Sequence, residues 1–185
     1  MSINRTFSIL MISFIAITLI SNDLYAETVS VNKFGFYYVV DKMALPITSE
    51  EYYTFESGLN YVAYYSNQKG NPSSQVVISI NAKSVKGHTQ TMQYNLYNNT
   101  DKFFYTNQMA SGNCKTIDRG RLSYGYKDGA YAIYSCVADG VDTYIYHFGT
   151  VYNDCLYSTM YVLPKSKSNK YLYQFENIRK SIVIK

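Results

Sequence analysis

The chain has 185 residues, among them 22 Tyr, 9 Phe, no Trp, 3 Cys and 2 His, with 17 basic and 13 acidic side chains. Hydrophobic residues make up 47% and charged residues only 16%, which excludes a disordered chain. The scarcity of His and Cys argues against a haem carrier or a multi-site zinc protein, and a net charge of +4 without a dense basic stripe argues against nucleic-acid binding.

Residues 1–26 have the pattern of a secretory signal peptide. A positive start is followed by an apolar run over residues 7–20, and Ala26 places a small residue at the expected cleavage point. The run is shorter than the about 20 residues that span a bilayer, so a retained anchor is the less favoured alternative. We expect cleavage, no stable membrane span afterwards, and a single globular domain over residues 27–185 in the periplasm or, alternatively, secreted.

The three cysteines all lie in the predicted mature chain. An oxidising compartment favours one disulfide and leaves one thiol over. The strand pattern described below puts Cys114 and Cys136 towards one end of a sheet and Cys155 beside a turn at the other end, so we expect a Cys114–Cys136 disulfide. Cys155 is then buried and inert, or pairs two copies into a homodimer, or is a reactive thiol, and the sequence leaves these three alternatives open.

The first half of the mature chain predicts three strands and a helix. The β-rich runs are residues 34–40, 59–65 and 75–83, and the last of them alternates with period two, which predicts one buried face. Residues 89–105 are expected to be helical, with an interruption at Asn98-Asn99.

Turn pairs divide the second half into an antiparallel meander of four strands. Asp-Gly pairs supply the positive φ that two-residue hairpins require. In chain order the predicted strands and turns are 114–126, Asp128-Gly129, 131–137, Asp139-Gly140, 143–152, Asn153-Asp154 and 155–163.

The register that follows from these turns sorts the side chains onto two faces. One face collects Ser123, Ala132, Tyr134, Cys136, Thr143, Ile145, His147, Ser158, Met160 and Val162. The other collects Leu122, Tyr124, Tyr131, Ile133, Val137, Tyr144, Tyr146, Phe148, Tyr157 and Tyr161. Neither face is plainly polar, so the sheet is either covered on both sides or covered on one side and used for binding on the other.

A C-terminal helix is expected over residues 170–182. Pro164 ends the last strand, residues 165–169 read as a basic loop, and the helix then follows the 3.6-residue apolar period with a Glu176–Lys180 ion pair. Residues 183–185 are either a short strand or part of the docked end.

Three segments and the order of the elements resemble the PsbP-like and DcrB-like periplasmic proteins. The segments are Phe34-Gly35-Phe36, Gly129-Ala130-Tyr131-Ala132 and residues 175–182. The resemblance implies an α+β fold, in which an antiparallel β-sheet meander is flanked by helices as an α/β/α sandwich with a C-terminal helix. It transfers no catalytic residue and implies a binding or assembly role, because members of this fold are mostly not enzymes.

The residues themselves point to no reaction. A Cys–His nucleophile would need Cys136 or Cys155 beside His147, and a metal site would need clustered ligands, for which the turn pair Asp139 and Asp142 is too small. No phosphate-binding loop is present. We therefore expect no enzyme activity, no catalytic or metal-binding residue and no cofactor.

The tyrosines are the remaining signal. Tyr is a common strand former, but it is also enriched at binding hot spots, and the candidate contact residues are Tyr144, Tyr146, Tyr157 and Tyr161. We expect an exported, non-enzymatic protein-binding protein. Its sharpest form is an immunity or inhibitor protein that neutralises a periplasm-acting toxin. The alternatives are a PsbP-like envelope assembly or uptake factor and a secreted effector or adhesin-like module.

Overall fold

Two antiparallel sheets form the framework of the molecule. The computed structural model describes residues 26–41, 53–56, 60–66, 76–105, 113–138 and 140–185, so the predicted signal peptide lies outside the described residues except for Ala26. A three-stranded sheet has the order β1-β2-β10, and a seven-stranded sheet has the order β3-β4-β5-β9-β8-β7-β6. Among the described residues, no helix has the length and apolarity needed to cross a bilayer.

The strands and helices have the following bounds. The strands are β1 (Ala26–Val31), β2 (Phe36–Asp41), β3 (Tyr53–Glu56), β4 (Asn60–Ser66), β5 (Val77–Ser84), β6 (Lys115–Tyr124), β7 (Lys127–Ala138), β8 (Val141–Tyr152), β9 (Cys155–Pro164) and β10 (Val183–Ile184). The helices are η1 (Asn32–Phe34), α2 (Thr89–Asn98), α3 (Thr100–Phe104) and α5 (Lys165–Lys180).

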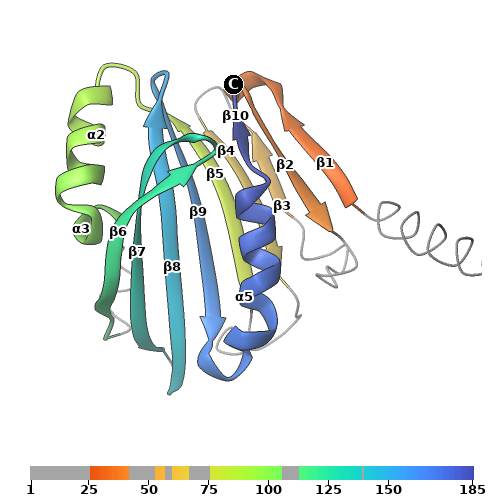
Figure 1. Cartoon of the computed structure of the whole chain (residues 1–185), viewed down its shortest axis with the longest axis vertical. Coiled ribbons are helices and arrows are strands. Elements are labelled where there is room, and N and C mark those ends of the chain that lie inside the picture. Colours follow the sequence, from red (N-terminus) through yellow and green to blue (C-terminus); the bar gives the residue numbers. More distant parts are fainter. Residues whose placement is uncertain (1–25, 42–52, 57–59, 67–75, 106–112, 139) are drawn as a thin grey trace, which may run out of the picture.

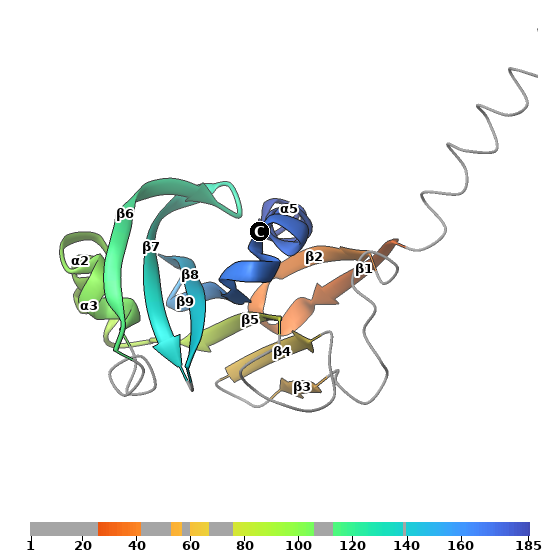
Figure 2. The same ribbon diagram turned by 90° about the horizontal axis from the view of Figure 1, so that it is seen from below.

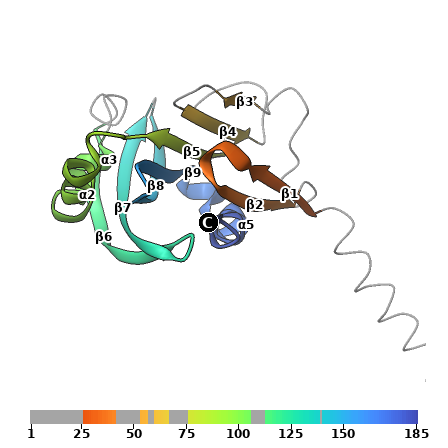
Figure 3. The same ribbon diagram turned by 90° about the horizontal axis from the view of Figure 1, so that it is seen from above.

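The seven-stranded sheet is strongly curved, and helices lie on both of its faces (Figure 1). Seen from below, β6 and β7 curl round towards α5, which lies inside the curve, whereas α2 and α3 lie outside it (Figure 2). The view from above shows the same order of layers, with the small sheet beside α5 (Figure 3). This is the expected α+β fold, an antiparallel meander between helices with a C-terminal helix on one face.

The core is divided by the sheet into two parts. On the inner face, Tyr161 and Phe175 are wholly buried in a cluster that also includes β2, β4 and β5. On the outer face, Leu96 of α2 and Phe104 of α3 pack over Tyr134 of β7.

On the outer face α2 and α3 contact β7 and β8, whereas on the inner face α5 contacts β8 and β9. On the inner face of β7, Tyr131 and Ile133 are half-buried and Val137 is 47% exposed. The outer face is therefore covered and part of the inner face stays accessible, which is closer to the second of the two alternatives that the sequence left open.

The register of two predicted hairpins is confirmed. Ala138 pairs with Val141, and Tyr152 pairs with Cys155. In the second of these turns Asn153 has φ 47° and Asp154 has φ 57°, the left-handed conformation that a two-residue hairpin needs and that Asn and Asp tolerate. Side chains of β7, β8 and β9 therefore divide between the two faces as expected.

The predicted turn at Asp128-Gly129 is wrong. The β6–β7 hairpin turns at Gly125 and Tyr126, with φ 57° and 65°, and Tyr124 pairs with Lys127. Gly129 lies inside β7, where a Cβ would come within 2.6 Å of the Gly149 carbonyl oxygen. The glycine that looked like a turn residue is thus required for close packing of strands, and this steric fact is invisible in the local sequence.

Further expectations about the C-terminal helix and the first strands also need correction. Residues 165–169 are not a loop, because α5 begins at Lys165 and its first turns bury Ser168 and Tyr171. The Glu176 carboxylate pairs with Arg179 rather than Lys180. The planar guanidinium of Arg179 donates one hydrogen bond to each carboxylate oxygen. Residues 34–40 divide between η1 and β2, and β1 and β3 were not expected.

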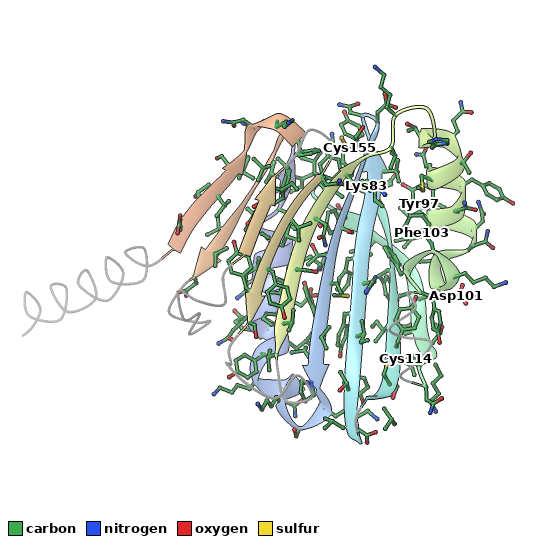
Figure 4. The ribbon with its side chains drawn as sticks, turned by 180° about the vertical axis from the view of Figure 1, so that it is seen from behind. Lys83, Tyr97, Asp101, Phe103, Cys114 and Cys155 are labelled. Atoms are coloured by element: carbon green, nitrogen blue, oxygen red, sulfur yellow. A yellow bond between two sulfur atoms is a disulfide. The ribbon has the colours of Figure 1, made fainter. Side chains whose placement is uncertain are left out.

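The Cys114–Cys136 disulfide is confirmed. It joins the start of β6 to β7, which pair directly in the sheet. Cys155 is a free, half-buried cysteine at the start of β9. Figure 4 shows Cys114 and Cys155 at opposite ends of the sheet, which is why they do not pair.

Removing the disulfide should weaken the fold measurably. The bridge joins residues 22 apart, so replacing Cys114 and Cys136 with Ser should lower the free energy of unfolding by about 3 kcal/mol, because the unfolded chain regains loop entropy. Urea titration of the oxidised proteins measures this. Cys155→Ser is the matched control and should change the free energy of unfolding by about 1 kcal/mol or less. An equal loss in both variants would contradict a bridge between Cys114 and Cys136.

Candidate functional site

Tyr144 and Tyr146 lie on β8, on the inner face of the sheet. Both are half-buried, and their ring centroids are 6.1 Å apart in an edge-to-face arrangement. On the neighbouring strand β7, Ile133 pairs directly with Tyr146. Tyr131 lies two residues before Ile133 and therefore on the same face. We call these four half-buried side chains, Tyr131, Ile133, Tyr144 and Tyr146, the aromatic surface.

The aromatic surface continues into the core through a chain of ring contacts. Tyr146 lies 6.0 Å from Tyr161, and Tyr161 lies 5.1 Å from Phe148 and 5.2 Å from Phe175 of α5. Such offset and edge-on pairs add about 0.5–1.5 kcal/mol each to the burial energy. The exposed rings therefore rest on a packed support, which limits the entropy that a partner would have to overcome on binding.

Two of the four tyrosines predicted to bind are not available for contact. Tyr161 is fully buried, and its hydroxyl donates to the carbonyl of Phe175 at 2.9 Å. Tyr157 is 4% exposed, and its hydroxyl donates to the Phe34 carbonyl at 2.8 Å. Both residues do share the face of Tyr144 and Tyr146, but α5 and the small sheet cover them. The predicted contact surface is therefore corrected to the β7–β8 side.

An ion pair on α5 packs against this face of the sheet. The Arg179 guanidinium donates to Glu176 at 3.1 and 2.7 Å, and its Cζ lies 4.7 Å above the Phe148 ring. Arg179 is 9% exposed, so both a carboxylate and a ring face are needed to offset its desolvation. Partial burial, with Tyr144 and the Glu176 carboxylate nearby, raises the pKa of Tyr146 above its ordinary value and keeps its hydroxyl neutral.

A second cation borders the aromatic surface at its other end. Lys165 Nζ lies 5.2 Å from the Tyr144 ring centroid and 3.6 Å from a carboxylate oxygen of Asp142. Sequence reasoning missed Lys165 as a neighbour of Tyr144 and Arg179 as a neighbour of Phe148. The local sequence held no signal for them, because the start and the last turns of α5 reach this face only through tertiary packing.

His147 lies on the opposite face, under the outer helices. Its ring centroid is 5.2 Å from that of Phe104 and 6.2 Å from that of Tyr134, and it is 8% exposed. Burial lowers the pKa of His147 to about 4, so the imidazole is neutral at pH 7. Within the described residues its Nε2 has no hydrogen-bond partner, and the surrounding rings give it the environment of a core residue.

The cysteines do not form a nucleophile with His147. Cys136 is held in the disulfide. Burial raises the pKa of the Cys155 thiol above its ordinary value, which disfavours the reactive thiolate. In the part of the chain that the structure describes, no three metal-binding side chains gather. What the inner face offers chemically is a supported set of ring edges and hydroxyls bordered by the cation Lys165, an arrangement suited to contact.

Comparison with known proteins indicates the fold. No protein-family model matches the chain, and no curated protein matches its sequence. The solution structure of cyanobacterial PsbP (CyanoP) from Synechocystis sp. PCC 6803 matches with a TM-score of 0.55 and 10% identity, over 87% of this chain and 93% of that one. A Pseudomonas aeruginosa protein of unknown function, a putative regulator, matches with a TM-score of 0.50 and 9% identity, over 87% and 98%.

A third structure is more distant. LpqN of Mycobacterium tuberculosis, involved in cell envelope biogenesis, matches with a TM-score of 0.45 and 10% identity, over 76% of this chain and 81% of LpqN. The first two likenesses each cover 87% of this chain. They establish a PsbP-like fold, as the sequence resemblance implied, and at such low identity they concern the fold alone.

The buried His147 should make stability depend on pH. Its pKa is about 4 in the folded protein and about 6.5 when unfolded, so the unfolded chain binds a proton first as the pH falls. Stability should therefore decrease between pH 6.5 and pH 4, by about 3 kcal/mol in total from this group. Urea unfolding at several pH values measures the slope.

The matched variant separates His147 from the carboxylates. His147→Gln should lose this part of the pH dependence, whatever the variant's stability at pH 7. An unchanged slope between pH 6.5 and pH 4 would show that His147 is not the responsible group.

Proposed function

We propose that this chain is an exported, non-enzymatic protein that binds another protein, and that in its sharpest form it is an immunity protein neutralising a toxin that acts in the periplasm. The observation that carries the binding role is the half-buried pair Tyr144 and Tyr146, which stands on a central strand paired on both sides. Rigid amphipathic rings of this kind contribute much contact area at little entropic cost.

The exported location is supported by two independent features. Residues 1–26 have a signal-peptide pattern, and the Cys114–Cys136 disulfide is typical of an oxidising compartment. An inhibitor needs no catalytic group. It needs only to cover the active site of its target, and the aromatic surface with Lys165 at its margin supplies ring edges and a positive charge for such a contact.

A second candidate function is an envelope assembly or uptake factor. The sequence resemblance to PsbP-like periplasmic proteins implied it, and the likeness to cyanobacterial PsbP, with a TM-score of 0.55, supports the fold on which that expectation rests. Both candidates use the aromatic surface for protein contact, and they differ in the partner, which is a toxin in one case and an envelope complex in the other.

Processing of the full chain tests the exported location. Expressed in a Gram-negative host, the chain should appear in the osmotic-shock fraction with Glu27 as its first residue, because cleavage follows Ala26. N-terminal sequencing of the purified protein measures this. Recovery from the culture medium would favour the secreted alternative, and a chain retained in the membrane with Met1 intact would contradict the proposal.

Binding to the product of the neighbouring gene tests the immunity role. The purified pair should co-elute on a sizing column, and changing Tyr144 and Tyr146 together to Ser should raise Kd by about thirtyfold or more, as expected for central hot-spot rings. Tyr173→Ser on α5 is the matched control, because Tyr173 is 73% exposed and lies outside the aromatic surface. It should leave Kd unchanged.

The outcomes separate the two candidates. Co-purification with an envelope complex and no toxin neighbour would replace the immunity role with the assembly role. A partner whose Kd is the same for the double variant and the wild type would exclude the aromatic surface as the contact.

A further inference from the structure

A pocket of about 360 Å³ lies where α2 meets the start of β7 and the end of β8. Its volume falls in the range of small-ligand pockets, about 300–1,000 Å³. The lining residues that matter here are Gln93, Tyr97, Tyr126, Lys127, Asp128 and Tyr152. No residue that lines the pocket belongs to the aromatic surface. Tyr152 lies eight residues of β8 from Tyr144, about 26 Å of strand, and the nearest member, Tyr131, is three residues from Asp128 along β7.

The pocket is built into the sheet, where β7 and β8 separate. Pairing between these strands ends at Ala130 and Gly149, although β7 starts at Lys127 and β8 continues to Tyr152. The carbonyl of Asp128 instead accepts hydrogen bonds from the hydroxyls of Tyr97, at 2.7 Å, and Thr150, at 2.6 Å. These bonds join α2 and β8 to the start of β7 at the edge of the opening. Figure 4 shows Tyr97 on α2 beside the sheet.

Tyr126 is held at the rim in an unfavourable conformation. It occupies the tip of the β6–β7 hairpin with φ 65°, although a bulky side chain strongly disfavours this region, and 76% of it is exposed. The neighbouring Gly125 fixes the tip against β10, because its carbonyl accepts from Ile184 N at 3.3 Å. The exposed Tyr126 ring contributes little to packing, although the backbone that carries it is strained. Backbone strain of this kind is found preferentially at binding sites.

Two cations lie against the tyrosines of this site. Arg121 Cζ is 3.9 Å from the Tyr97 ring centroid, and Lys127 Nζ is 3.9 Å from that of Tyr152. Within the described residues, neither forms a salt bridge with a carboxylate. A cation above a ring face is attracted to the ring without donating a directed N–H hydrogen bond. Both side chains therefore keep N–H donors for a negatively charged ligand.

We propose that this pocket binds an acidic oligosaccharide, a short glycan that carries a carboxylate or a phosphate. Tyr126 would stack on the apolar face of a sugar ring, as amphipathic aromatic residues do. Lys127 and Arg121 bind the anionic group, while the Gln93 amide and the Asp128 carboxylate accept hydrogen bonds from the sugar hydroxyls.

Titration of the purified protein with defined sugars tests the proposal. The probes are digalacturonate for the carboxylate, the disaccharide trehalose 6-phosphate for the phosphate, and maltose as the neutral sugar, and binding is followed by backbone NMR shifts. At least one acidic sugar should bind, with shifts confined to α2, the β6–β7 tip and the end of β8, and it should bind about tenfold or more tightly than maltose. Comparison of the two acidic probes identifies the anionic group.

Variants that preserve the fold locate the site. Tyr126→Gly removes the ring and suits the positive φ, and Lys127→Gln removes the charge; each should weaken binding about tenfold or more. Tyr173→Ala and Lys170→Gln on α5 remove an exposed ring and an exposed charge elsewhere and should leave binding unchanged.

Three outcomes would overturn the proposal. They are no binding of either acidic sugar at about 10 mM, equal binding of maltose, and equal binding by the Tyr126→Gly variant. A protein partner that binds the aromatic surface should bind Tyr126→Gly as tightly as the wild type, so failure here and failure of the proposed function are told apart.

Discussion

The contact between Tyr161 and α5 is the one on which most of the structure depends. Tyr161 is fully buried in the middle of β9, and its hydroxyl donates to Phe175 while its ring packs against the Phe175 ring. With α5 fixed there, the last turn of the helix brings Arg179 over Phe148, and the start of the helix brings Lys165 to Tyr144. One aromatic contact thus positions both ends of the helix along the candidate surface.

The same contact connects the C-terminus to the distant hairpin. Because α5 leads directly into β10, Ile184 reaches the carbonyl of Gly125 and pairs with Phe36. The β6–β7 hairpin is therefore held at its tip, while at its base the strands of β7 and β8 pair normally. Beyond Ala130 and Gly149 the pairing of β7 with β8 ends, and the pocket beside α2 lies at this point.

The tyrosines have several different structural roles, which a count of tyrosines cannot distinguish. Tyr38 binds the hydroxyls of Tyr61 and Tyr65 at 2.8 Å each, so these rings join β2 to β4 as core residues with satisfied polar ends. Tyr144 and Tyr146 present half-buried ring edges, and Tyr126 is held in solvent. A residue that is apolar in its body and polar at its tip can occupy all of these environments, which explains why so many tyrosines are compatible with one small domain.

The sequence by itself determined the order of the elements apart from β1 and β3, and two of the three hairpin registers, because alternation and turn residues act over a few residues. The strand order in turn placed Cys114 and Cys136 at one end of the sheet and so predicted their disulfide. The sequence could not place the β6–β7 turn, since two glycine-containing pairs compete there and only the Gly129–Gly149 contact, between strands, decides. Nor could it tell that Tyr157 and Tyr161 are covered while Tyr144 and Tyr146 are not. Side-chain alternation assigns a face, but what packs on that face comes from α5 and the small sheet, which are far away in the chain and meet the meander only in the tertiary structure.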